Sequence, residues 1–181
     1  MDELTRTTLA NLYSTDRAAQ TQAYYDLLAA TEQPVDWAYE VWDELVSALQ
    51  HKDNHVRSIA SQTLINLARS DPDQRILRDF DALLAVTRDE RFVTARHCLQ
   101  ALRKVGLAGD AQRQRVMEGL TARYHESAAE KNGTLIRFDI LQGLRSLYDQ
   151  VQDECIRAQA LALIETEQDP KYRKKYASVW R

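Results

Sequence analysis

The sequence has few of the residues that interrupt helices. It contains five glycines and three prolines among 181 residues, too few for the many turns of an all-β fold. No apolar run approaches the roughly 18 residues that a membrane-spanning helix needs, and the N-terminal segment lacks the apolar centre of a signal peptide. We therefore expect an all-α protein of long helices and compact corners, with no membrane partner.

Cysteine is equally scarce. The two cysteines, Cys98 and Cys155, are too few for a disulfide framework, so we expect a reducing compartment and a cytoplasmic protein. Each cysteine falls on an apolar stripe of its predicted helix, which favours a place in the core over a role as nucleophile.

One helical pattern recurs along the chain. In its clearest copy, Val56-Arg57 is followed by a small or apolar residue and then by two leucines, and an aspartate stands three positions before Val56. Residues 136–147 and 172–180 repeat the pattern well, whereas residues 91–102 and 19–27 repeat part of it. The copies begin 35 to 45 residues apart. This spacing predicts five units, which span residues 1–33, 34–70, 71–106, 107–148 and 149–181.

A second set of apolar stripes alternates with this pattern. These stripes lie in residues 3–13, 35–50, 75–88, 111–126 and 149–165. In the last of them, the residues expected to face the core are Val151, Cys155, Ala158 and Ala162. Each unit therefore has a first and a second helix. One such pair cannot bury both apolar stripes, whereas a stack of pairs forms a continuous core.

The repeated residues resemble HEAT repeats. The closest copy consists of Asp53, Val56, Arg57, Ala60, Leu64 and Leu67. We expect the aspartate to cap the second helix and the arginine to reach an acidic or carbonyl group of its own or the adjacent unit. The resemblance implies a single domain over residues 1–181, a right-handed α-solenoid of about five stacked antiparallel helix pairs. It also implies that the second helices line a concave side and the first helices a convex side.

Formal charge differs between the two sets of helices. The segments around the second helices, residues 51–69, 88–104, 131–147 and 171–181, together carry +12, which leaves −15 for the rest of a chain whose net charge is −3. A basic concave face with an acidic back would attract an acidic partner and orient it. The alternative is that these charges only keep the helix surfaces solvated.

Side chains that lie off the apolar stripes of the second helices are the candidates for partner binding. Exposed aromatic and arginine side chains are the usual energetic anchors of an interface, and we expect Phe138 and Leu141 to form an exposed apolar spot. The candidate residues are Tyr24, Gln62, Arg96, His97, Gln100, Arg103, Phe138, Leu141, Gln142, Arg145 and Lys174.

The sequence contains no recognisable catalytic or metal-binding pattern. The glycines are isolated, so no phosphate-binding loop is expected, and His51 and His55 lack a third ligand. Some bacterial DNA glycosylases and the phycobilin lyases are built from HEAT-like repeats, but the groove carboxylates and aromatic residues that such a glycosylase requires are not matched here. We expect no enzymatic activity, no cofactor and no metal.

The predicted function is a protein-protein interaction scaffold that binds an acidic or helical partner in a basic concave groove. The alternative is sequence-independent binding of nucleic acid through the same face, with a steep dependence on salt. Asp89, Glu90 and Asp139 lie within the basic set and favour the protein partner. The loop at residues 125–134 is either a functional lip of the groove or a tolerated insertion.

Overall fold

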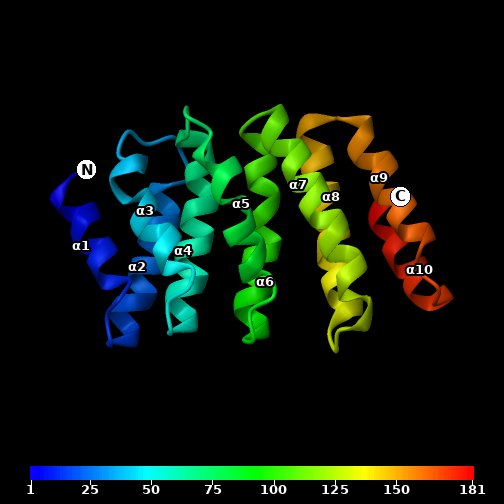
Figure 1. Cartoon of the computed structure of the whole chain (residues 1–181), viewed down its shortest axis with the longest axis horizontal. Helices are drawn as coiled ribbons and strands as arrows, with labels where there is room; N and C mark the ends of the chain where they lie inside the picture. Colours follow the sequence, from blue (N-terminus) through cyan, green and yellow to red (C-terminus); the bar gives the residue numbers. More distant parts are fainter. The chain divides into compact units, whose positions relative to one another are not determined.

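The computed structural model describes residues 1–181 as an all-α protein without β-strands. Its ten α-helices follow one another as five pairs (Figure 1): α1 (Glu3–Asn11) and α2 (Arg17–Ala30), α3 (Ala38–Ala48) and α4 (Asn54–Leu67), α5 (Arg75–Val86) and α6 (Phe92–Ala101), α7 (Asp110–Glu126) and α8 (Gly133–Val151), and α9 (Glu154–Glu165) and α10 (Pro170–Ala177). Four short 3₁₀ segments complete the structure: η1 (Ala68–Ser70), η2 (Leu102–Leu107), η3 (Ser127–Ala129) and η4 (Ser178–Trp180). The predicted all-α fold of repeated helix pairs is confirmed, and none of the helices has the length and apolar character needed to cross a membrane.

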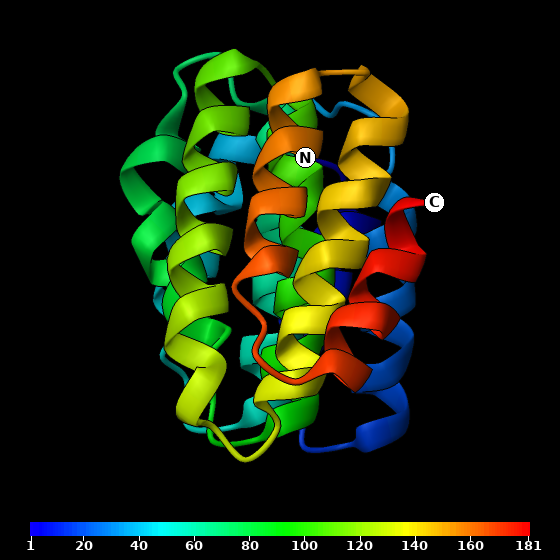
Figure 2. The ribbon, with the colours of Figure 1, turned by 90° about the vertical axis from the view of Figure 1, so that its right-hand side faces the viewer.

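The chain divides into two compact units, Met1–Cys98 and Leu99–Arg181, each of which contains more than one helix pair. From here on, these two parts are called the first unit and the second unit. In the first unit, α4 packs against α2, α3 and α5, and Trp42 and Phe80 are fully buried. In the second unit, α8 packs against α7, α9 and α10, and α8 and α10 lie side by side in Figure 2. Tyr124 and Tyr176 are buried there with their ring centroids 6.5 Å apart. Each unit therefore has large aromatic side chains in its own interior.

Aspartates begin three of the second helices. Asp16, Asp53 and Asp169 each accept a hydrogen bond from the backbone N–H two residues further on, at 2.9, 2.9 and 2.8 Å. The first N–H groups of a helix have no partner within the helix, so each of these carboxylates satisfies one of them. The predicted capping roles of Asp53 and Asp169 are confirmed.

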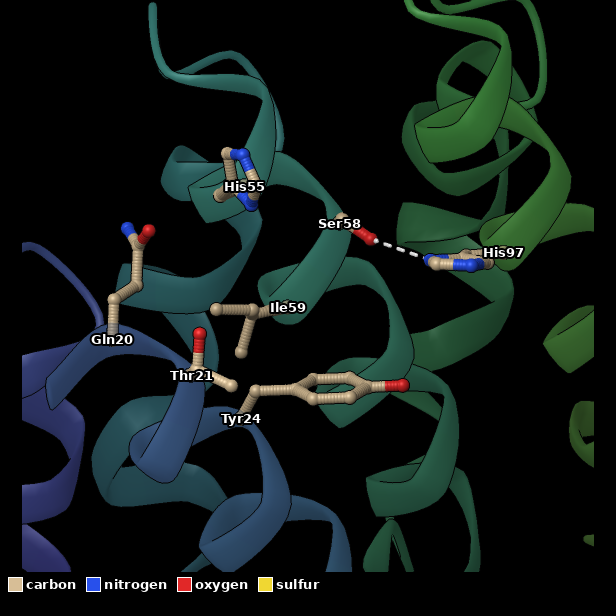
Figure 3. A pocket seen from close by; sticks show the side chains of 7 residues that line it. All are labelled: Gln20, Thr21, Tyr24, His55, Ser58, Ile59 and His97. Carbon is tan, nitrogen blue, oxygen red and sulfur yellow. Dashed lines mark hydrogen bonds between the residues drawn. The ribbon is translucent and has the colours of Figure 1, made fainter. Parts of the chain in front are cut away.

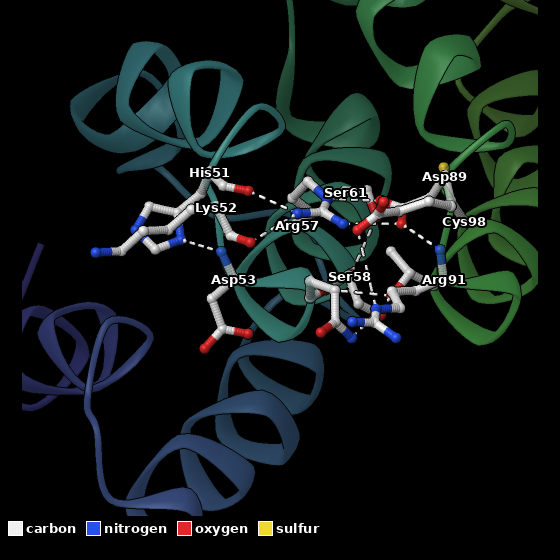
Figure 4. Close-up of polar contacts among 12 residues, drawn as sticks. His51, Lys52, Asp53, Arg57, Ser58, Ser61, Asp89, Arg91 and Cys98 are labelled. Atoms are coloured by element: carbon white, nitrogen blue, oxygen red, sulfur yellow. Dashed lines mark hydrogen bonds and ion pairs between the residues drawn. The ribbon is translucent and has the colours of Figure 1, made fainter.

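Arginine side chains connect successive helix pairs of the first unit. The guanidinium of Arg57 on α4 makes two hydrogen bonds to the carboxylate of Asp89, of which the Nη2–Oδ1 bond is 2.8 Å long, and it also donates to the carbonyl oxygen of His51 at 2.8 Å (Figure 4). One pair earlier, Arg17 Nη1 donates to Asp53 Oδ2 at 2.9 Å. The prediction that Arg57 reaches an acidic or carbonyl group is confirmed, and in the structure it reaches both.

A related arrangement occurs in the second unit. Arg137 Nη1 of α8 lies 2.7 Å from Glu167 Oε2, and Arg173 Nε of α10 donates to the carbonyl oxygen of Glu167 at 2.8 Å. Glu167 is buried, and it lies between α9 and α10. Arg57 and Arg137 are thus paired with buried carboxylates and Arg173 with a backbone carbonyl, so the arginines of this repeat position are structural groups.

The apolar stripe predicted for residues 149–165 is wrong. Val151 belongs to the last turn of α8, and Gln152 ends that helix with a φ of 54°, so the helical periodicity does not continue across it. Asp153 caps a new helix, α9, by accepting the N–H of Cys155. The buried residues of α9 are Ile156, Ala160, Leu163 and Ile164, and Cys155 is exposed. Cys98, in contrast, is buried as predicted.

Candidate functional site

The second helices of the first unit form a shallow pocket of about 120 Å³. Three successive helix pairs contribute to it, because its residues come from α2, α4 and α6 (Figure 3). The side chain of Ile59 and the ring of Tyr24 provide apolar surface, and the other groups are polar. The lining residues are Gln20, Thr21, Tyr24, His55, Ser58, Ile59 and His97.

A chain of hydrogen bonds runs behind this pocket from α2 to α6. The hydroxyl of Tyr24 donates to Gln62 Oε1 at 3.2 Å. Gln62 Nε2 donates to both the carbonyl oxygen and the hydroxyl of Ser58, at 3.1 and 3.2 Å. The hydroxyl of Ser58 lies 3.4 Å from Nδ1 of His97. Four side chains from three helix pairs are thus held in fixed orientations.

The two titratable members of this chain have shifted pKa values. Burial lowers the pKa of His97, and the positive charge of Arg96 lowers it further. Burial raises the pKa of the Tyr24 hydroxyl, against the opposing effect of its hydrogen bond to Gln62. Both shifts favour the uncharged form of the side chain.

A second candidate surface lies on α8 and α10 of the second unit. Phe138, Gln142 and Arg145 are spaced four and three residues apart on α8, which places them on one face of the helix. The ammonium of Lys175 lies 4.4 Å from the centroid of the Phe138 ring, and the guanidinium carbon of Arg145 lies 5.7 Å from that of Trp180. Both distances suit cation–π contacts, so this face combines positive charge with aromatic rings.

The α10 helix carries the greatest excess of positive charge among the second helices. Its eight residues include Lys171, Arg173, Lys174 and Lys175 and no acidic residue. Arg173 is bonded to a backbone carbonyl, whereas the three lysines are exposed. Lys174 and Lys175 lie three and four residues after Lys171, so the three side chains share one face of the helix.

The structure brings part of the predicted set of binding residues together. In the first unit, Tyr24 and His97 line the pocket. Gln62 is only 9% exposed, so it supports the pocket from behind and the prediction that it faces outward is wrong. Arg96 is partly buried.

The other predicted residues belong to the second unit, in which Gln100 is exposed. Phe138 and Arg145 are partly buried and Gln142 is exposed on the α8 face. The side chain of Arg103, in η2, lies beside Gly143 of α8. Lys174 is one of the exposed lysines of α10.

One further expectation about the second unit is wrong. Leu141 is 0% exposed, so it does not form an exposed apolar spot with Phe138. The reason is that α8 packs against three other helices and η2, and its buried surface is therefore wider than one stripe. The charge of Arg145 is neutralised, because its Nε donates to Asp149 Oδ1 at 2.7 Å. The basic character of the second helices is thus concentrated in α10.

Several residues of these surfaces were not predicted from the sequence. Thr21 and Ser58 belong to the pocket, but a threonine or serine on a helix carries no distinctive sequence signal. Lys175 and Trp180 contribute to the α8–α10 surface. The run of basic residues in 171–181 pointed to this region, although only the structure shows which lysine lies on an aromatic ring.

The structure contains no group of three or more histidine, cysteine, aspartate or glutamate side chains arranged to hold a metal ion. Nδ1 of His51 accepts the backbone N–H of Asp53 at 3.1 Å. His55 lies at the pocket instead. These two histidines therefore have different surroundings.

Comparison with known proteins supports the fold. No protein-family model matches the sequence, and no curated protein matches it. Among solved structures, the chain is similar to an engineered protein from a structural genomics consortium, with 19% sequence identity and a TM-score of 0.55 over 99% of this chain and 79% of the other. At this identity the similarity shows the fold alone.

A second solved structure is a designed armadillo repeat protein in complex with the peptide (KR)4. It shares 16% sequence identity with this chain, with a TM-score of 0.49 over 99% of this chain and 88% of the other. This TM-score is too low to support an argument about function.

Proposed function

We propose that the chain is a HEAT-like repeat scaffold without catalytic activity, which binds an acidic segment of a partner protein on its second-helix side. The observation that carries this proposal is the face of α10. Lys171, Lys174 and Lys175 are exposed on it, and Lys175 lies over the ring of Phe138. This combination of positive charge and an aromatic ring suits a segment that carries both carboxylates and an apolar side chain.

The arrangement of the lysines supports the choice of an acidic partner. Like charges three or four residues apart on a helix repel each other and lower the stability of the helix. Lys174 and Lys175 lie in the last turn of α10, where the helix dipole favours positive charge, but Lys171 lies in the first turn, where the dipole disfavours it. A bound carboxylate would relieve this repulsion, and the positive surface would increase the rate of association with an acidic segment.

The test uses defined ligands and the full chain. An array of acidic, neutral and basic peptides is probed with the wild type and with a variant that combines Lys171→Glu, Lys174→Glu and Lys175→Glu. We expect the wild type to prefer acidic peptides that contain an apolar residue, and we expect the variant to lose this preference.

A matched control separates the local effect from the change in net charge. The control variant combines Arg6→Glu, Lys52→Glu and Lys131→Glu, three exposed residues outside α10, so its net charge changes by the same amount. It should bind acidic peptides as the wild type does. Equal loss of binding in both variants would contradict the role of α10, and the absence of any peptide preference in the wild type would contradict the proposed function.

Nucleic acid is the competing ligand for a basic surface, and the same experiment includes it. A fluorescent duplex oligonucleotide is titrated with the wild type between about 50 and 200 mM salt. Tight binding with a logarithmic slope near −0.9 per neutralised phosphate, together with weak binding of peptides, would replace the protein partner with nucleic acid.

We also propose the cytoplasm as the compartment of this protein. Both cysteines are free thiols, with Cys98 buried and Cys155 exposed. An exposed free thiol on a protein without disulfides suits a reducing environment.

A further inference from the structure

The pocket of the first unit is a separate feature from the lysines of α10, and its chemistry is different. No lysine, arginine, aspartate or glutamate lines it. Its volume of about 120 Å³ is slightly smaller than an engineered cavity of roughly 150 Å³ that binds benzene. The space therefore suits one side chain of moderate size.

The donors and acceptors of the hydrogen-bond chain behind the pocket can be assigned, starting from one backbone carbonyl. The carbonyl oxygen of Ser58 can only accept, so the group of Gln62 that faces it at 3.1 Å is the amide nitrogen. Gln62 Oε1 therefore faces Tyr24, and the Tyr24 hydroxyl uses its hydrogen to donate to it. The oxygen of Tyr24 keeps lone pairs that can accept a hydrogen bond from a ligand.

The histidine at the other end is assigned from its contact with the Ser58 hydroxyl. The hydroxyl of Ser58 accepts a hydrogen bond from Gln62 and lies 3.4 Å from Nδ1 of His97, and we assign its own hydrogen to this contact with Nδ1. A neutral imidazole that accepts at Nδ1 carries its hydrogen on Nε2. His97 thus offers an N–H donor to a ligand. The lowered pKa of His97 is consistent with the neutral tautomer.

We propose that this pocket binds one uncharged amide side chain, glutamine or asparagine, of a partner segment. Its apolar carbons would lie against Ile59 and the ring of Tyr24, its NH₂ group would donate to the Tyr24 oxygen, and its carbonyl oxygen would accept from Nε2–H of His97. Figure 3 shows the Tyr24 hydroxyl directed toward the side of the pocket that carries His97. The proposal rests on the proposed function in one respect, because it takes the ligand to be part of a bound polypeptide.

Other side chains fit this arrangement less well. A carboxylate has no hydrogen to donate to Tyr24, and no lysine or arginine lines the pocket to pair with its charge. An ammonium has no acceptor for the N–H of His97. A leucine would fill the space but would leave both the donor and the acceptor without a partner, and unpaired polar groups that lose water are costly.

The test uses blocked amino acids as small probes of the pocket alone. The N-acetyl N-methylamides of glutamine, glutamate, lysine and leucine are titrated into the isotope-labelled full chain and followed by NMR. The titrations are made at about pH 8, above the ordinary pKa range of histidine. We expect the glutamine derivative to bind most tightly, with shift changes at Tyr24, Ser58 and His97. It should bind about 25-fold more tightly than the leucine derivative, as two additional neutral hydrogen bonds of about fivefold each would provide.

Two variants and one control test the assigned donor and acceptor. Tyr24→Phe removes the acceptor and His97→Leu removes the donor, and each should weaken binding of the glutamine derivative about fivefold without affecting the leucine derivative. Tyr25→Phe is the matched control, because Tyr25 is the adjacent residue, is 61% exposed and lies outside the pocket. It should bind all four probes as the wild type does.

Three outcomes would overturn the proposal. They are equal or tighter binding of the leucine or glutamate derivative, shift changes that lie away from the pocket, and no binding of the glutamine derivative up to its solubility limit. The variant with three glutamates on α10 should retain the glutamine response. Its behaviour separates a failure at this pocket from a failure of the scaffold function proposed above.

Discussion

Replacement of Arg57 by methionine is expected to destabilise the first unit strongly. Arg57 and Asp89 form a bidentate pair in which the side chains are only 14% and 4% exposed. Methionine keeps much of the unbranched length of arginine but removes all of its donors. Asp89 then remains as a carboxylate away from water, with the backbone N–H of Arg91 at 2.8 Å as its remaining hydrogen bond.

The expected cost is about 3 kcal/mol, the lower end of the range for breaking a buried ion pair. We choose the lower end because the Arg57 side chain is not completely buried. The natural control is Arg17→Met. The Arg17–Asp53 pair occupies the corresponding place one helix pair earlier, but its side chains are 59% and 25% exposed. Its loss should cost about 0.5 kcal/mol, as is typical of an exposed pair.

The assay is urea unfolding followed by circular dichroism, with the two variants and the wild type at several pH values. Burial alone would raise the pKa of Asp89, but the hydrogen bonds from Arg57 and from the Arg91 N–H, with the charges of both arginines, lower it. A carboxyl whose pKa is lowered in the folded state stabilises the protein above its unfolded value of about 3.9 and loses this contribution as the pH falls below it. The difference between the wild type and Arg57→Met should therefore be complete above about pH 5 and narrow below about pH 4.

Two results would refute this reasoning. If Arg57→Met and Arg17→Met cost the same free energy, burial of the pair does not determine its contribution. If the difference between the wild type and Arg57→Met is unchanged between pH 7 and strongly acidic solution, the carboxylate of Asp89 is not responsible for it. A double variant with Asp89→Asn should be more stable than Arg57→Met alone, because it no longer contains an unpaired buried charge.

Three further predictions concern particular side chains. Trp42→Ala should lower the free energy of unfolding by about 4 kcal/mol, because Trp42 is fully buried and donates to Asp79 at 2.8 Å; a loss below about 1 kcal/mol in urea unfolding would contradict this. Gln152→Gly should raise the melting temperature through about 1 kcal/mol of added stability, because Gln152 has a φ of 54°; a lower melting temperature would show that its side chain matters more than its backbone. Burial raises the pKa of Cys98 to about 12, so a thiol reagent at about pH 8 should label only the exposed Cys155 in the native protein. After denaturation it should label both cysteines. Two labels on the native protein, counted by mass spectrometry, would show that Cys98 is accessible.

The helix pairs were predictable because their signals are local and repeated. Asp53 caps α4 and Arg57 contacts both an acid and a carbonyl group, as the pattern indicated. The register of α9 was not predictable in the same way. In the sequence, an apolar periodicity runs from Val151 to Cys155, and only the left-handed backbone of Gln152 shows that the two residues belong to different helices.

The candidate sites were less predictable than the fold. Tyr24 and His97 were identified because they lie off the apolar stripe, but Ser58 connects to His97 across 39 residues of sequence, and no local pattern records such a contact. Leu141 was misjudged for a related reason. The number of neighbours that a helix packs against sets the width of its buried face, and this number depends on the tertiary structure.

The contacts between arginine and aspartate make the two sides of a helix pair chemically different. The α3–α4 pair offers Asp53 to the preceding pair and Arg57 to the following one. A tandem copy of this pair, inserted directly after the original, would find a charged partner at both of its junctions. If the two ends of the inserted pair were exchanged, Arg57 would face the arginine of the preceding pair and Asp53 would face the aspartate of the following pair. Each junction would then bring like charges together. Lengthening by duplication of whole pairs therefore requires no new kind of contact, whereas rearrangement of their order does.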